Sequence, residues 1–254
     1  MYGPRGFIDR VLIAAQGRLS CYRLAVSLVE GKRGLEIGGP SEVFQGWYRP
    51  LFIYNRVGAL DNCDFSRTTA WSSHSDSFRF SHFKRPGKIF FCDGSNLADV
   101  ENGSYDFVLS SHNLEHFANP VKALKEWQRV LRPGGSLILV LPHYLKTFDH
   151  RRTLTPVAHM IEDFERNTQE DDLSHLEEIL SGHDLKMDSA AGTLGDLRRR
   201  SLRNFDNRCL HHHVFDEHNS RELLTAVGME VVAVEQALPF HIFLLAQLPA
   251  GRKS

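Results

Sequence analysis

Short apolar runs recur along this chain, separated by segments in which apolar positions return every three or four residues. The runs predict seven strands, at 33–38, 52–61, 88–93, 105–111, 136–142, 229–237 and 240–248. SLILVLP, at 136–142, is almost wholly apolar, which is typical of a strand with both sheet faces covered. The last two strands are joined by a short link that contains Pro239, and so short a link permits only an antiparallel pair.

Three segments have helical spacing of their apolar positions. In NPVKALKEWQRVLRPGG, at 119–135, Asn119 stands at the N-cap, Pro120 at the first helical position, and the final Pro-Gly-Gly stops the helix. The segment 219–228 predicts a second helix that ends in glycine. Residues 7–30 alternate apolar positions with arginines and predict one or two amphipathic helices, covering a sheet edge or a ligand site.

Strands that alternate with helices and close in a hairpin predict an α/β fold. We expect a doubly wound, mostly parallel seven-stranded sheet with an antiparallel C-terminal strand and helices on both faces. Residues 143–217 break the rhythm and form a His-rich insertion after strand five, with two weakly helical pieces at 155–167 and 172–181. The predicted organisation is an N-terminal helical segment, 1–30, that covers the site, followed by one domain, 31–254.

Composition narrows the functional classes. The net charge of −1 argues against a dedicated nucleic-acid binder, which would usually carry a basic excess. The four cysteines form no C-x-x-C pair, so we expect isolated thiols in a reducing compartment and a cytoplasmic location. The apolar patch near the N-terminus is interrupted by Asp9 and Arg10 and is too short to span a bilayer. A peripheral membrane role for the basic segment 7–30 stays open.

The stretch RGLEIGGPS, at 33–41, predicts a buried strand followed by a turn without bulky side chains. Such a turn lets a ligand approach the backbone, although an ordinary turn has the same pattern. Glu36, Asp61, Asp93 and Ser111 all fall at the predicted carboxyl ends of strands. Ligands of open α/β sheets bind outside these ends, so the four residues predict a shared site.

These motifs resemble those of the class I, Rossmann-like S-adenosylmethionine-dependent methyltransferases, of the type with an LEIGGPS first motif. The resemblance covers about 33–145 and again 219–248. It rests on LEIGGPS, the acid Asp61, FCDGSNLADVENGSYDFVLSSHNLEHFANP and ALKEWQRVLRPGGSLILVLPH. The chain departs from the usual G-x-G-x-G, because Pro40 and Glu42 stand where the second and third glycines are expected.

The resemblance implies S-adenosylmethionine as cofactor. Glu36 and Gly38 match the acid and first glycine of the first motif, Asp61 the acid that accepts from both ribose hydroxyls (with Asp64 as alternative), and Asp93 the acid facing the adenine amino group. The cofactor residues so implied are Glu36, Gly38, Gly39, Pro40, Asp61, Asp93, Gly94, Ser110 and Ser111.

Histidines are the candidates for catalysis. If the acceptor is a hydroxyl, the protein has to align it and remove its proton, for which a histidine is well suited. His143 and His150 follow strand five and should overhang the reacting centre, and His112 follows strand four. His143 is the first choice. Glu115 and His116 more often orient the following loop and helix than do chemistry.

The insertion is expected to bind the acceptor, through Asp149, Arg151, His211 and His213. HHHVFD, at 211–216, could hold a divalent metal with Asp149 or Asp216, but a metal site is not favoured over a polar surface or hydrogen bonds to substrate hydroxyls. Arginines of the insertion could contact a phosphate on the acceptor; they are Arg198, Arg199, Arg200 and Arg203.

The function expected from these features is O-methylation of a small polar acceptor such as a sugar or glycan precursor. N- or C-methylation of a metabolite or tRNA base is the first alternative, although Ser110-Ser111-His112-Asn113 stands in place of the NPPY-type motif of amino-group methyltransferases. A non-catalytic cofactor-binding protein is the second. The partner is a small molecule or glycan-type acceptor rather than nucleic acid, and a homodimer stays open.

Overall fold

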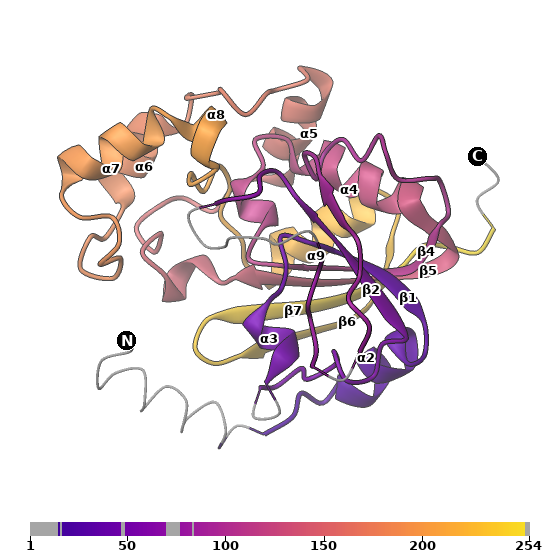
Figure 1. The fold of residues 1–254 in the computed structure, drawn as a ribbon. Coiled ribbons are helices and arrows are strands. Elements are labelled where there is room, and N and C mark those ends of the chain that lie inside the picture. The colour runs from indigo at the N-terminus through magenta and orange to yellow at the C-terminus, as the bar shows by residue number, and fades with distance from the viewer. Residues whose placement is uncertain (1–14, 16, 47–48, 70–76, 83, 252–254) are drawn as a thin grey trace.

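The computed structural model describes residues 15, 17–46, 49–69, 77–82 and 84–251. At its centre is a seven-stranded sheet with the order β3-β2-β1-β4-β5-β7-β6 (Figure 1). The strands are β1 (Arg33–Ile37), β2 (Ala59–Asp64), β3 (Ile89–Phe91), β4 (Tyr105–Ser111), β5 (Leu131–Pro142), β6 (Glu230–Ala237) and β7 (His241–Gln247).

The strand directions confirm the predicted fold class. β3, β2, β1, β4 and β5 pair in parallel, whereas β7 runs antiparallel to both β5 and β6. The sheet therefore has six strands in one direction and a reversed C-terminal strand, as the short link before β7 requires.

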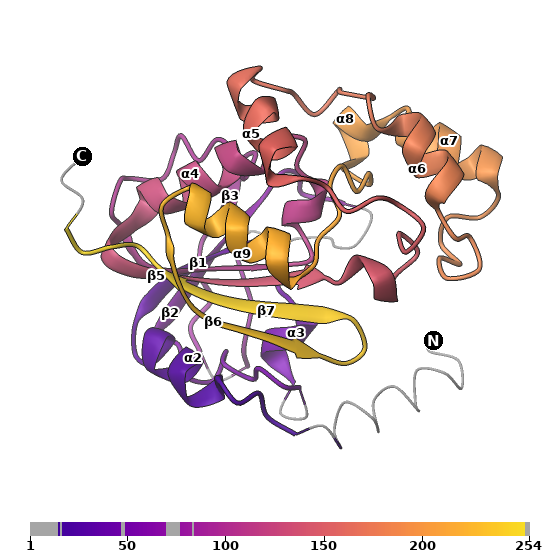
Figure 2. The same cartoon turned by 180° about the vertical axis from the view of Figure 1, so that it is seen from behind.

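Helices cover both faces of the sheet (Figures 1 and 2). One face packs against α4 (Pro120–Val130), α5 (Val157–Glu165) and α9 (Glu217–Ala226), which contribute side chains such as Leu124, Met160 and Leu223 to a single core cluster. The other face packs against α2 (Tyr22–Val29) and α3 (Glu42–Gln45), through Leu28 and Phe44 among others. Residues of β4 and β5 alternate between these two cores, because successive strand residues point to opposite faces.

Helix α4 begins where the sequence predicts. The Asn119 side chain accepts a hydrogen bond from Lys122 N at 2.9 Å, which satisfies one of the amides that a helix start leaves without a partner. Trp127 is buried, and its indole donates to Gly94 O at 3.0 Å. The helix ends at Val130, and β5 begins at the next residue, so strand five is longer than the expected 136–142.

The second strand differs from its prediction. The run 52–61 was expected to be a strand ending at Asp61, but β2 begins at Ala59 and ends at Asp64. Most of the apolar side chains before it are buried in the α2 and α3 core from turns, with Ile53 and Tyr54 at most 1% exposed. Burial rather than strand pairing explains their apolar character, so the predicted strand end is wrong by three residues.

The insertion at 143–217 contains more helix than expected. The 3-10 turn η2 (Tyr144–Lys146) opens it, and the two expected helices are α5 and α6 (Leu176–Gly182). Two further helices were not predicted, α7 (Leu194–Ser201) and α8 (Asn204–Asn207). In both views α6, α7 and α8 gather at one end of the molecule (Figure 2).

Of the helices expected over 7–30, α2 is present, and it buries Ala25, Leu28 and Val29. The part of this expectation that falls on residues 1–14 and 16 lies outside the described residues. Within the described part of the chain, every helix is too short or too polar to cross a lipid bilayer.

Candidate active site

A cavity of about 1150 Å³ opens at the carboxyl ends of β1, β2 and β4. This exceeds the roughly 300–1000 Å³ of a typical small-molecule site. One wall, the sheet wall, comes from the strand ends and the loops after them, at 37–43, 63–65, 93–94 and 111–117. The insertion wall lies opposite and comes from 146–148 and several later residues of the insertion. No residue of α2 lines the cavity.

The glycine turn after β1 forms the floor of the sheet wall. Gly38 has φ +76°, and a Cβ there would lie 3.2 Å from Asn113 Cγ, so the position favours glycine on both counts. Gly38 N donates to Cys63 O at 2.8 Å, and Gly39 N donates to the Asn62 side chain at 2.9 Å. Gly38, Gly39 and Pro40 line the cavity, as the sequence predicts, while the amides of both glycines are used within the protein.

Glu36 supports this turn from beneath. Its carboxylate accepts from Tyr54 OH at 2.6 Å and from Ser41 N at 3.1 Å, and the residue is fully buried without lining the cavity. Burial raises the pKa of Glu36 to about 7, and the hydrogen bonds from Tyr54 and Ser41 oppose the rise. The structure therefore gives Glu36 contacts that hold the turn rather than contacts with a ligand.

Asp61 and Asp64 lie on the same strand but at different ends of the sheet. Asp61 Oδ2 accepts from Arg33 and Tyr105 OH, and Oδ1 accepts from Lys88 N, each at 2.8 Å. Arg33 and Tyr105 begin their strands, so this carboxylate lies at the end of the sheet away from the cavity. Asp64, the alternative residue, ends β2 and lines the cavity.

Asp93 lines the cavity and is tied to the insertion. Its Oδ1 accepts from Ser95 N at 2.8 Å, while Oδ2 pairs with Arg208 at 3.1 Å. Arg208 reaches Glu170 with its other terminal nitrogen, also at 3.1 Å. Burial raises the pKa of Glu170 to about 7, although Arg208 opposes that rise. Gly94 lines the cavity beside Asp93, as expected.

The end of β4 separates its two serines. Ser111 lines the cavity, whereas Ser110 is completely buried in the sheet, because neighbouring strand residues point to opposite faces. His112 lines the cavity with φ +50°, and its Nε2 lies 2.7 Å from Nδ1 of His241. Burial lowers the pKa of His112 well below its usual value, so this imidazole is neutral and already hydrogen-bonded.

The other two histidines expected to act as bases do not line the cavity. His143 is buried at the end of β5, with Nε2 3.2 Å from Glu217 of α9. His150 Nδ1 donates to Thr147 O at 3.0 Å, and its Nε2 lies 3.7 Å from Asp184. Both side chains contact other residues of 143–217 instead of the cavity. Their position after strand five could not reveal this difference.

His211 is the histidine that reaches the cavity with a carboxylate behind it. Its Nδ1 donates to Asp149 Oδ2 at 2.6 Å, and Asp149 is also paired with the buried Arg152 at 3.2 Å. Burial favours a neutral imidazole, but Asp149 outweighs it and raises the pKa of His211. For Asp149, His211 and Arg152 outweigh burial in the same way and lower its pKa to about 2. With Nδ1 bound to the carboxylate, Nε2 is the proton acceptor.

Glu115 and His116 stand beside His211 in the cavity, a placement that a purely structural role does not require. His116 Nδ1 donates to Leu210 O at 3.0 Å. Burial raises the pKa of Glu115 to about 7, and its Oε2 has no hydrogen-bond partner. Ligand atoms of Glu115, His116 and His211 lie within 4.8 Å of one another, so this cavity cluster could hold a divalent cation or a substrate hydroxyl.

The remaining substrate candidates diverge. Arg151 pairs with Asp184 at 2.8 Å, has a side chain 53% exposed, and does not line the cavity. His213 is buried away from the cavity, among other histidines, so it does not share a metal site with His211. Asp216 caps α9, where it accepts from two backbone amides. Among the four arginines expected at a phosphate, Arg200 alone lines the cavity.

Comparisons with known proteins agree with this picture over part of the chain. Residues 35–139, less than half of the chain, match the family model described as "Methyltransferase domain". A protein of Streptomyces fradiae, described as an uncharacterized 37.1 kDa protein in transposon TN4556, is 44% identical over 45 residues. That match spans 18% of this chain and 13% of the relative.

Solved structures with a similar course include a SAM-dependent methyltransferase of Methanosarcina mazei, with 14% identity, TM-score 0.48, and coverage of 91% of this chain and 99% of that one. The 1,6-didemethyltoxoflavin-N1-methyltransferase of Burkholderia thailandensis has 12% identity, TM-score 0.47, and coverage of 98% and 92%. Because both TM-scores are below 0.5, the fold assignment rests on the strand order and directions of the protein itself.

Proposed function

We propose that this protein, which carries a methyltransferase domain over residues 35–139, is an S-adenosylmethionine-dependent enzyme that methylates an oxygen of a small polar acceptor. The observation that carries the proposal is the pair formed by His211 and Asp149 at 2.6 Å, with His211 lining the same cavity as the glycine turn. The turn supports a bound cofactor, and the pair supports removal of a hydroxyl proton.

The residues of the sheet wall fit the cofactor. In the turn at 38–40 only Pro40 carries a side chain, and a Cβ on Gly38 would crowd Asn113. Asp64 lines the cavity and would accept from the two ribose hydroxyls, since a carboxylate is an acceptor that can bridge two donors. Asp93 and Gly94, which also line it, would meet the adenine. When bound, S-adenosylmethionine supplies an electrophilic methyl group on a positively charged sulfur.

The insertion wall supplies the acceptor site and the base. His211 Nε2 would take the proton of an acceptor hydroxyl bound near it, while the cofactor held by the sheet wall would supply the methyl group to the acceptor oxygen. Asp149 holds the ring in the tautomer with a proton on Nδ1 and stabilises the imidazolium that forms. His211 takes over the role expected of His143 and His150, because those two side chains do not line the cavity.

The chemistry of the insertion wall favours a polyhydroxylated acceptor. Its polar lining residues include acidic, basic and hydroxyl side chains. They are Lys146, Thr147, Glu170, Asp188, Arg200 and Arg208. Among the residues of 143–217 that line the cavity, Phe148 is the one Phe, Tyr or Trp. Such a lining suits a sugar or a glycan precursor, and Arg200 suits an acceptor that carries a phosphate.

The test measures cofactor binding and turnover separately. Titration calorimetry with S-adenosylmethionine should show micromolar-range binding, and release of S-adenosylhomocysteine should depend on an added sugar or nucleotide sugar. Methylated oxygen in the product, identified by mass spectrometry and NMR, supports the proposal. Methylated nitrogen or carbon replaces it with the alternative chemistry, and binding without turnover across the acceptors indicates a non-catalytic protein. Absence of binding removes the cofactor itself.

A further inference from the structure

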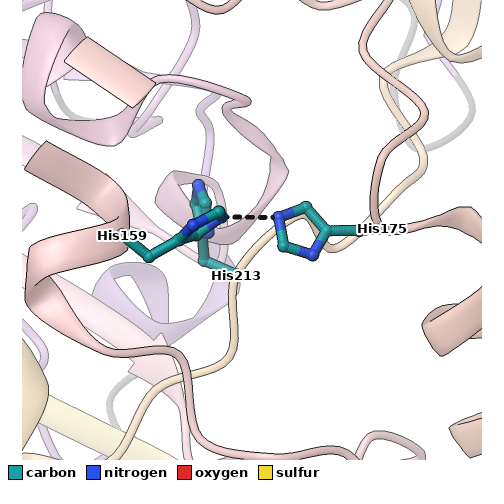
Figure 3. Close-up of side chains that lie close together, drawn as sticks. All are labelled: His159, His175 and His213. Carbon is teal, nitrogen blue, oxygen red and sulfur yellow. Dashed lines mark hydrogen bonds between the residues drawn. The ribbon is translucent and has the colours of Figure 1, made fainter. Parts of the chain in front are cut away.

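Three histidines from separate parts of the insertion meet outside the cavity (Figure 3). His159 lies on α5, His175 directly precedes α6, and His213 lies before α9. Ligand atoms of all three fall within 4.8 Å of one another. Nε2 of His159 and Nε2 of His175 are 3.0 Å apart. Each ring belongs to a different segment, so the cluster joins parts of the chain that are distant in sequence.

A fourth possible ligand, Asp163, points into the same space from α5. Its Oδ2 lies 3.5 Å from Nε2 of His159 and 3.5 Å from Nε2 of His213. This oxygen accepts no hydrogen bond, although the residue is only 8% exposed. Burying a carboxylate oxygen without a partner is costly, so the arrangement calls for a positive group at this point.

The distances between these atoms suit a tetrahedral ion. With bonds of about 2.0–2.1 Å to nitrogen and oxygen, the ligand atoms around Zn²⁺ stand about 3.3 Å apart. Three of the six separations in this set, 3.0 Å between His159 and His175 and 3.5 Å from Asp163 to both His159 and His213, are close to that value. His213 is buried. Its Nε2 donates to Ala118 O at 3.4 Å, and its Nδ1 has no hydrogen-bond partner. Hydrogen bonding within the described residues therefore leaves this cluster incompletely satisfied.

The surrounding contacts also orient the proposed ligands. His175 Nδ1 lies 3.3 Å from Glu178, which turns Nε2 toward the cluster, and Asp163 Oδ1 accepts from Thr168 at 3.0 Å. Contacts of this kind behind the ligands are usual in metal sites, because they fix ring orientation and raise basicity. Glu178 also accepts from Arg152 at 3.0 Å, and Arg152 contacts Asp149.

We propose that His159, His175 and His213 bind a divalent transition metal of the Zn²⁺ type, with the buried Asp163 carboxylate beside the ion as its charge partner. Three imidazole ligands leave a fourth position that Asp163 or a water molecule can fill. The ion joins α5, the start of α6 and the segment before α9. Because His213 is two residues from His211, binding at this three-histidine site also fixes the segment that carries the proposed base. The metal site itself does not depend on the proposed methyltransferase activity.

Metal content of the purified full chain, measured by mass spectrometry of the elements, tests the site. We expect one bound zinc ion per chain. Dialysis against a chelator should remove this ion, and added Zn²⁺ should restore it. His159→Ala should remove one ion per chain, since this ring is 34% exposed and its loss leaves little core unpacked. His218→Ala, an exposed position on α9, is the matched control and should keep the ion.

Two further variants separate metal loss from misfolding and from the cavity cluster. Asp163→Asn keeps the shape and the acceptor for Thr168, so it should fold and bind zinc at least tenfold more weakly. His116→Ala alters the cavity cluster and should leave the ion in place. The proposal is overturned if the chain neither holds nor takes up Zn²⁺ or Co²⁺. It is also overturned if the ion is lost in His116→Ala and kept in His159→Ala and Asp163→Asn.

Discussion

The two walls of the cavity are built in different ways. The sheet wall places its residues through strand ends and tight turns, and its contacts join neighbouring strands, such as Gly38 N to Cys63 O. The insertion wall places its residues through side-chain pairs that span long stretches of chain. Asp149 and His211 are 62 residues apart in sequence, and Arg208 meets Asp93 from across the cavity.

This difference predicts a division of labour. The sheet wall is rigid and repeats the geometry of its fold, so it suits a cofactor common to many enzymes. The insertion wall depends on long-range pairs, so it suits the acceptor and the base, which differ between enzymes. Substitutions on the two walls should therefore change different measured quantities.

The largest effect is expected at the insertion wall. His211→Ala should lower turnover about 10²–10⁴-fold, because a positioned general base contributes about that much. Cofactor affinity measured by calorimetry should stay within about threefold of wild type, since the residue contacts the acceptor side. His218→Ala should leave both quantities unchanged. A variant that loses cofactor affinity as strongly as turnover would contradict the division between the walls.

Asp64→Asn tests the sheet wall. The amide keeps one acceptor oxygen and loses the other, so one charged hydrogen bond to the ribose is lost; at roughly 1.5–3 kcal/mol this should raise the cofactor Kd about 10–100-fold. Asp61→Asn is the matched control on the same strand. It should leave the cofactor Kd unchanged while lowering the free energy of unfolding by about 1–3 kcal/mol, because Tyr105 and Arg33 lose their acceptor. The reverse result would restore Asp61 as the ribose ligand.

Asp149→Asn should move the pH dependence of turnover. In the wild type, Asp149 raises the pKa of His211, so turnover falls as the pH drops through a value above 6.5 and the base becomes protonated. Removing the carboxylate lowers the pKa of His211, so the acid limb should shift to lower pH. The maximal rate should fall about tenfold or more because the ring loses its orientation. Rate profiles in buffers of constant ionic strength measure both changes, and an unmoved limb would exclude His211 as the titrating base.

The smallest effect is expected where the walls meet. Arg208→Gln removes the pairs with Asp93 and Glu170 and should raise the cofactor Kd about three- to tenfold. Arg203→Gln, whose arginine has a side chain 74% exposed, is the control and should change nothing. If Arg208→Gln altered acceptor KM alone, the contact between the walls would have no part in cofactor binding.

Much of the sheet wall could be predicted from the sequence because its signals are local. The glycine turn, Asp93 and the cap of α4 each depend on residues a few positions apart. The predicted position of Asp61 at a strand end is wrong, because apolar residues such as Ile53 and Tyr54, which are buried outside any strand, have the composition of a strand and displaced its predicted end. Because β2 is short, an error of three residues in its predicted end moves Asp61 from the carboxyl end of the strand to its first half.

The insertion wall could not be predicted in the same way. The choice of His211 among fourteen histidines depends on Asp149, and no periodicity connects residues so far apart. The run of three histidines predicted a shared role, yet His211 lines the cavity and His213 lies in the buried cluster. The cytoplasmic location and the homodimer stay predictions, since both depend on surroundings beyond the single chain.

The bridge made by Arg208 has a kinetic consequence. Its ion pairs join Asp93, after β3, to Glu170 of the insertion, so these two segments can separate only after the bridge breaks. If the cofactor binds beside Asp93, as proposed, we expect breakage of this bridge to slow its departure in each cycle.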